Sequence, residues 1–192
     1  MFIKIAATTS PAAPAKILFY YDRETLFNDV SLMSNFMAKN LASKEGNSLT
    51  DEFAMSDDEK DLFGVCVQQT LPDIYESMAK ITHAVIPAFD DDVTEAGTKS
   101  GTDISGTTVT IPIGHYVEFT LQDNDAYNEN VLTMVDVSLY NAIKQGTLKE
   151  YYSVIIQPDF FKVCTERFIA ELFKLKQRLF QFKKKSIAPN IN

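Results

Sequence analysis

The side chains of this chain best suited to acid–base chemistry near neutral pH are two histidines, His83 and His115. An imidazole has an unperturbed pKa of about 6.5, so it can accept or donate a proton under physiological conditions. Catalysis also needs a partner, because a second group must activate or orient the reacting one. Neither histidine lies at a recognised catalytic spacing from a serine, a cysteine or a carboxylate. We therefore predict that neither is catalytic and that the chain is not an enzyme.

A run of carboxylates offers oxygen ligands of the kind that Ca²⁺ and Mg²⁺ prefer. Its members are Asp90, Asp91, Asp92 and Glu95. The run lacks the alternating Asp/Asn spacing and the turn glycine of an EF-hand loop. This difference favours a solvated acidic loop over a metal site.

The two cysteines, Cys66 and Cys164, fall on the apolar faces of different predicted helices. They form no CxxC pair, and no nearby histidine could complete a zinc site with them. We predict that both are buried, reduced core residues. For the whole chain we expect no catalytic residue, no metal site and no cofactor.

Positive charge gathers at the end of the last predicted helix, on Lys174, Lys176, Arg178, Lys183, Lys184 and Lys185. Cations suit the negative end of a helix dipole, so a solvated helix end is one interpretation. A local docking site for an acidic partner or for passing nucleic acid is the other. The formal net charge of -8 argues against nucleic-acid binding over the whole surface, because such binding depends on lysine and arginine releasing counterions.

Composition predicts the kind of fold that must position these groups. With 192 residues the chain is long enough for one domain with a substantial core. It contains only 7 glycines, 7 prolines and no tryptophan, which argues against a turn-rich all-β protein. We expect a mainly α fold with a small β element (α+β), a helical bundle with an inserted β-hairpin or extended arm.

Capping patterns predict the first two helices. Asp22 is a suitable N-cap for a helix that ends near Gly46. Ser56 and Glu59 form a capping box for the second helix, since each side chain can satisfy an unpaired backbone donor. Pro72 removes a hydrogen bond inside this helix and is expected to kink or split it.

The second half of the chain predicts further helices. A third helix is expected from about Asp123 or Asp125 to Gly146. A second capping box at 147–150 would open a short separate segment. Pro158 suits the first turn of a last helix, because its missing amide would be unpaired there anyway.

The last predicted helix is rich in aromatic residues, namely Phe161, Phe168, Phe173, Phe180 and Phe182. They fall on or beside an apolar stripe, so packing in the core is the first interpretation. A subunit interface is the alternative for some of them, because aromatic residues are enriched at interfaces.

Residues 88–121 form a polar segment that is acidic at its start and then rich in Thr, Ser and Gly. Within it, 108–111 and 117–121 alternate as half-buried strands do and could pair with each other. An alternative hairpin pairs residues near Val93 with residues near Val109. Both arrangements place a small β arm on a helical body.

We predict three parts: an N-terminal extended arm (1–21), one helical domain with the inserted β arm (22–185), and a C-terminal tail (186–192). The prolines of the SPAAPA stretch favour extended structure in the first arm. No window approaches the ~20 apolar residues needed to span a bilayer. The apolar run at the N-terminus is too short for a signal peptide. We expect no export signal, a reducing interior and no membrane partner.

The order of parts resembles that of a known group of virion proteins. A strand, HYVEFTL, enters a helix, NENVLTMVDVSLYNAIKQG, and a short connection, EYYSVI, leads to a terminal helix, FIAELFKLKQRLFQFKKK. This succession, over roughly residues 50–185, is similar in order and spacing to head-to-tail adaptor or neck-ring (connector) proteins of tailed bacteriophages, including those of crAss-like phages. The long N-terminal arm and Pro72 depart from the pattern.

The resemblance implies a structural role in the virion. Such proteins form a ring, commonly a dodecamer, beneath the portal protein and contact other neck or tail proteins through extended arms. It implies a location in the neck and tail region of the virion, with assembly in the host cytoplasm and only transient, non-specific contact with DNA. The termini and residues 88–121 would then be the interaction arms.

Two alternatives remain open at the level of sequence. One is a phage tail-completion or stopper protein, which is again structural. The other is a small helical regulatory protein or enzyme unrelated to virions, with a cleft beside His115 and the acidic loop.

Overall fold

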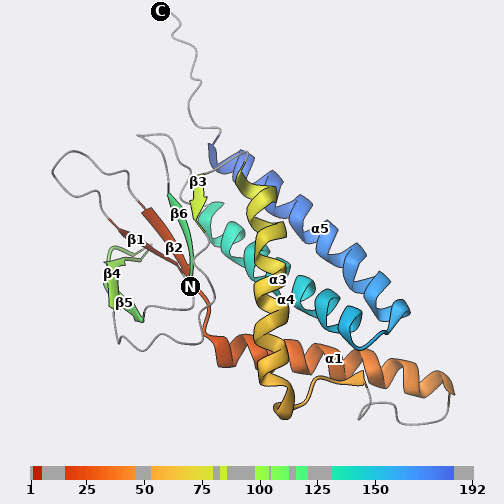
Figure 1. Ribbon diagram of the computed structural model, residues 1–192. Coiled ribbons are helices and arrows are strands. Elements are labelled where there is room, and N and C mark those ends of the chain that lie inside the picture. Colours follow the sequence, from red (N-terminus) through yellow and green to blue (C-terminus); the bar gives the residue numbers. More distant parts are fainter. Residues whose placement is uncertain are drawn as a thin grey trace, which may run out of the picture.

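The structure is a computed structural model, and it describes residues 2–5, 16–45, 53–79, 83–85, 98–103, 105–112, 116–120 and 131–183. Long helices form the larger part, and an antiparallel sheet lies to one side of them (Figure 1). A β-hairpin is inserted between two of the helices along the chain. The predicted class, mainly α with a smaller β part, is confirmed.

The helices pack around α4, which lies centrally among them (Figure 1). Their bounds are α1 (Arg23–Glu45), α3 (Lys60–Ala79), α4 (Leu132–Val154) and α5 (Pro158–Lys183), and a 3-10 turn, η1 (Asp57–Glu59), precedes α3. Buried side chains occupy most of the surface of α4, which contacts α1, α3 and α5. None of the described helices combines the length and apolar character that crossing a membrane requires.

Three predicted helix starts are confirmed. The backbone amide of Thr25 donates to Oδ2 of Asp22 at 2.8 Å, so Asp22 caps α1. The backbone amide of Ser56 donates to Oε2 of Glu59 at 2.7 Å, which forms the capping-box contact before α3. Pro158 is the first residue of α5.

The prediction that Gly146 ends the third helix is wrong, because α4 continues through it. A Cβ at this position would lie 2.2 Å from Cγ2 of Thr70 and 2.9 Å from Cε2 of Phe168. The glycine therefore allows α3 and α5 to approach α4 closely. The capping box predicted at 147–150 is also wrong, since the hydroxyl of Thr147 donates to the carbonyl of Ile143 at 2.8 Å inside the helix.

The second helix is not split at Pro72, because α3 is continuous across it. Pro72 lies on the exposed side of α3. Water can supply a donor on that side, so the helix tolerates the proline. The predicted end of the first helix at Gly46 and the predicted start of the third near residue 123 lie outside the described residues.

The sheet is antiparallel, with the strand order β3-β6-β2-β1-β4-β5. The strands are β1 (Phe2–Ile5), β2 (Lys16–Tyr20), β3 (His83–Val85), β4 (Thr98–Thr102), β5 (Thr108–Pro112) and β6 (Tyr116–Thr120). Two of them come from the predicted N-terminal arm. Within β2, Ile17, Leu18 and Phe19 are buried, so this stretch belongs to the core of the fold.

The strands β4 and β5 form a hairpin, here named the hairpin arm, at the margin of the sheet. The arm joins β1 through a single ladder pair, Lys4 with Thr102, and Ile111 packs in a small cluster with Leu18. Strand β6 pairs with β2 and β3, so the predicted pairing of 108–111 with 117–121 is not formed. The alternative pairing of residues near Val93 with residues near Val109 is not formed either, because Val109 pairs with Gly101 of β4.

The close approach at Gly146 predicts the effect of adding one methyl group. We expect Gly146→Ala to lower the free energy of unfolding by about 1–3 kcal/mol, because the new Cβ overlaps Thr70 and Phe168. Urea denaturation followed by circular dichroism measures the change. In a Thr70→Ala background the same substitution should cost less, because the nearest overlapping atom is removed. An equal cost in both backgrounds would contradict this contact.

The turn between α4 and α5 places an isoleucine in the left-handed region, with a φ of 56° at Ile156. The amide of Gln157 donates to the carbonyl of Tyr152 at 2.9 Å, and the amide of Ile156 approaches the carbonyl of Ser153 at 3.4 Å. This is the pattern of a Schellman motif, in which glycine is favoured at the left-handed position. Ile156 is 81% exposed, so its side chain adds little packing energy that could offset the steric penalty.

We expect Ile156→Gly to raise the free energy of unfolding by about 0.5–1 kcal/mol. The substitution removes the steric penalty of the left-handed conformation, which is about 1–2 kcal/mol. It also raises the conformational entropy of the unfolded chain, which lowers the stability by about 0.4–1 kcal/mol. Urea midpoints of the two proteins test this. Ile156→Ala is the matched control, since it shortens the side chain and keeps the penalty. A comparable gain from alanine would show that backbone strain is not the cause.

Candidate functional site

Most side chains considered for chemistry lie outside the described residues, namely Asp90, Asp91, Asp92, Glu95 and His115. His83 lies in β3, where its backbone pairs with Thr120 of β6. Its side chain is not among those that the structure describes. Within the part of the chain that the structure describes, no group of three or more His, Cys, Asp or Glu residues is placed to hold a metal. The sequence-based expectations for these five residues and for His83 stay predictions.

The two cysteines are buried and unpaired, as predicted. Cys66 lies on α3 and Cys164 on α5, and both contribute to the core. Burial raises the pKa of each thiol to about 12. The thiolate is the reactive form, so neither residue is suited to nucleophilic or redox chemistry at neutral pH.

Two members of the basic cluster, Lys174 and Arg178, make contacts within the chain. Nζ of Lys174 lies 2.7 Å from Oε1 of Glu171. The guanidinium of Arg178 donates to the carbonyl of Met134 at 2.5 Å and to the hydroxyl of Ser138. Arg178 thus ties the end of α5 to the start of α4. Residues 184–185 lie outside the described part, so the docking interpretation of the cluster stays a prediction.

The aromatic residues of α5 do not all belong to the core. Phe168 is buried, whereas Ile169, Phe173 and Phe180 are 60%, 61% and 59% exposed. Their spacing of four and seven residues places these three on one side of the helix, away from α4. We name them the outer ridge. The prediction that the aromatic stripe packs in the core is therefore wrong for Phe161, Phe173 and Phe180, which are all exposed, and the interface alternative remains for them.

A second group of exposed apolar side chains, a pair, lies on α1. Leu32 is 55% and Phe36 59% exposed, and their i, i+4 spacing places them on one side of the helix. Helical spacing in the sequence predicts an apolar stripe on this helix that includes Phe36 but not Leu32, namely Leu26, Phe27, Val30, Met33, Phe36, Met37 and Leu41. Two large apolar residues one turn apart, one of them off the stripe, are the pattern that could have indicated a second surface.

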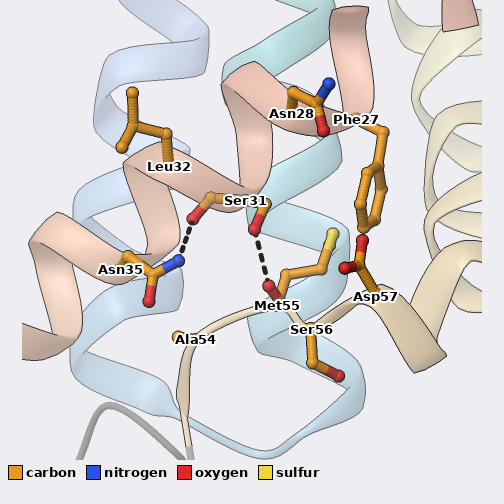
Figure 2. A pocket seen from close by; sticks show the side chains of 9 residues that line it. All are labelled: Phe27, Asn28, Ser31, Leu32, Asn35, Ala54, Met55, Ser56 and Asp57. Carbon is orange, nitrogen blue, oxygen red and sulfur yellow. Dashed lines mark hydrogen bonds between the residues drawn. The ribbon is translucent and has the colours of Figure 1, made fainter. Parts of the chain in front are cut away.

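A groove that includes Leu32 runs between α1 and residues 54–57 (Figure 2). It is lined by Phe27, Asn28, Ser31, Leu32, Asn35, Ala54, Met55, Ser56 and Asp57. The hydroxyl of Ser31 donates to the carbonyl of Met55 at 2.7 Å, and the amide of Met55 donates to the hydroxyl of Ser34 at 2.8 Å. These bonds and the buried Met55 side chain fix the second wall of the groove against α1.

Two tyrosine–aspartate contacts tie the end of β2 and the helix α1 to α4. The hydroxyl of Tyr21 donates to Oδ1 of Asp136 at 2.8 Å. The hydroxyl of Tyr140 donates to Oδ2 of Asp29 at 2.9 Å, and Nζ of Lys144 lies 3.3 Å from the same oxygen. Burial, reinforced by the carboxylates, raises the pKa of both tyrosines, so they remain protonated donors. These groups hold β2 and α1 against α4.

The buried thiols predict slow labelling of the native protein. At pH 8 we expect DTNB to modify Cys66 and Cys164 at least about a hundredfold more slowly than a free thiol, because little thiolate forms. The rate should rise with pH toward about 12, where the thiols ionise. Both thiols should react at once in concentrated urea. Rapid labelling of the folded protein at pH 8 would contradict the burial of these residues.

Comparisons with known proteins assign the chain to no family. It matches no protein-family model, no curated protein and no solved structure. Its function has to be argued from its own surfaces.

Proposed function

We propose that this protein is a structural subunit that forms an oligomeric ring with copies of itself. The ring would lie in the neck of a tailed bacteriophage, between portal and tail, as the order of elements along the sequence suggests. The observation that carries the assembly part of the proposal is the outer ridge of α5. Its three large apolar side chains are about three-fifths exposed in the single chain.

Exposure of this ridge leaves a sizeable free energy available for association. Burying one large apolar side chain contributes about 1.5–3 kcal/mol. Phe173 and Phe180 also lack a role in the core, where Phe168 and Leu175 of the same helix are buried. Isolated apolar residues are ordinary on protein surfaces, but aligned ones mark interaction sites. A neighbouring subunit would cover the ridge.

Two separate apolar surfaces favour a ring over a symmetric dimer. The outer ridge lies on α5, and the exposed pair Leu32 and Phe36 lies on α1. A two-fold dimer uses one self-complementary patch, whereas a heterologous contact joins two different patches and gives a ring when the rotation between copies closes. In this proposal the outer ridge of one copy faces the α1 surface of the next.

The hairpin arm and the overall charge fit the same role. The arm lies at the margin of the sheet beyond β1, with Ile111 packed against Leu18, and its outer strand β5 can reach a neighbour or an adjoining ring. Ordered arms that extend a sheet or fill a groove are a common means of subunit contact. The net charge of -8 suits a channel through which DNA slides with only transient contact. The portal protein and other neck or tail proteins would be the partners.

Charge placed on the outer ridge tests the proposal. We expect wild-type protein to form multi-subunit particles, and Phe173→Asp with Phe180→Asp to weaken each contact at least about a hundredfold, because apolar burial is lost and a charge is desolvated. Mass photometry over a concentration series measures the change. Both side chains are exposed, so helical circular dichroism should be unchanged.

Ala170→Asp is the matched control, since Ala170 is exposed on the same helix outside the outer ridge. It adds a charge without removing an aromatic ring and should leave assembly largely intact. Wild-type protein that stays monomeric at all concentrations, even with the portal partner present, would sink the proposal. If the control variant weakened assembly as much as the ridge variant, the outer ridge would not be the interface.

A further inference from the structure

The groove beside α1 has two walls of different chemistry. Figure 2 shows Asn28, Leu32 and Asn35 along the side of α1 that borders it, with i, i+4 and i+7 spacing. Nδ2 of Asn35 donates to the carbonyl of Ser31 at 3.0 Å, so this amide offers its second hydrogen and its oxygen to a peptide backbone. The amide of Asn28 likewise carries donors and an acceptor that match the groups of a peptide backbone. Leu32, lying between the two amides, offers an apolar contact. This wall suits an extended peptide with uncharged side chains.

The opposite wall is extended chain that ends in acidic residues. Ser56 has an extended backbone, with φ -98° and ψ 168°. Asp57 and Asp58 follow it, both are exposed, and they lie in the first turn of η1. Nζ of Lys60 lies 3.6 Å from Oδ1 of Asp57 and offsets part of this charge, but the two aspartates outnumber it, so a peptide in the groove would meet net negative charge at this end. Positively charged residues next to an uncharged extended stretch are the complementary sequence.

We infer that the groove binds the C-terminal segment of a neighbouring copy, residues 184–192, KKSIAPNIN. In this segment Lys184 and Lys185 complement the acidic end of the groove, and no charged side chain follows them. Pro189 favours an extended conformation of the residue before it. Ile187 supplies an apolar side chain for Leu32. The inference rests on the proposed self-assembly and adds how neighbours interlock.

The geometry of α5 excludes the chain's own segment as the occupant. The groove lies near the start of α5, where the ring of Phe53 is 6.3 Å from that of Phe160. At a rise of ~1.5 Å per residue, α5 carries the chain about 35 Å from Phe160 to Lys183. Residues 184–192 span at most about 32 Å when fully extended. These residues are too short to reach back to the groove of their own chain and also lie along it. The segment in the groove must therefore come from another copy.

Cysteine cross-linking in the full chain tests this contact. One preparation carries Leu32→Cys and the other Ile187→Cys, and the two are mixed under mild oxidation. The native thiols should not interfere, because both are buried. We expect a covalent pair of one chain from each preparation. Tyr75→Cys, at an exposed position of α3, replaces Leu32→Cys as the control and should give at least about tenfold less product, the ratio that ~1.4 kcal/mol of binding preference produces.

Charge reversal adds a second readout. Asp57→Lys with Asp58→Lys should lower the cross-linking yield severalfold, and Lys184→Glu with Lys185→Glu in the partner preparation should restore it. A yield that does not respond to either change overturns the inference. So does a product from Tyr75→Cys equal to that from Leu32→Cys.

The same samples separate this inference from the ring proposal. Multi-subunit particles without the Leu32–Ile187 cross-link overturn the groove contact and leave the ring intact. Cross-linked pairs that never close into a ring support the groove contact and overturn the ring. A chain that carries both Leu32→Cys and Ile187→Cys should form disulfides with other chains. A disulfide between the two positions of one chain overturns the inference.

Discussion

The fold depends on the absence of a side chain at Gly146. At this position α3 and α5 meet α4 from two sides, and a single methyl group would overlap both Thr70 and Phe168. Close packing here brings the buried faces of three helices together, and protein cores tolerate very little misfit. This contact allows α3 and α5 to approach α4 closely. Phe168 of α5 faces the contact, whereas the outer ridge lies on the exposed side of the same helix.

Sequence patterns predicted the features that depend on neighbouring residues. The caps at Asp22 and Ser56 were predicted because each needs only a polar side chain and the next turn of helix. Gly146 was misread because a glycine that ends a helix and a glycine at a helix crossing look alike in one sequence. Only the long-range neighbour Thr70 distinguishes them. The pairing of β2 with β6 joins residues about a hundred positions apart, which no local pattern encodes.

The candidate surfaces were predicted only in part. Spacing placed Phe168 and Phe173 on or beside one stripe of the last helix, but a stripe does not reveal how far neighbouring helices extend over it. The structure buries Phe168 and leaves Phe173 exposed, because α4 and α3 cover only one side of α5. The groove beside α1 depends on the bonds of Ser31 and Ser34 to Met55, across more than twenty residues of sequence. Periodicity contains no information about such bonds.

The proposed ring depends on the outer ridge being a contact between subunits. An electron cryo-microscopy reconstruction of the assembled wild-type protein, alone or with the portal partner, tests this most directly. We predict a closed ring in which Phe173 and Phe180 are buried against α1 of the next subunit. A ring in which both side chains face solvent, or a protein found only as single chains, would contradict the account.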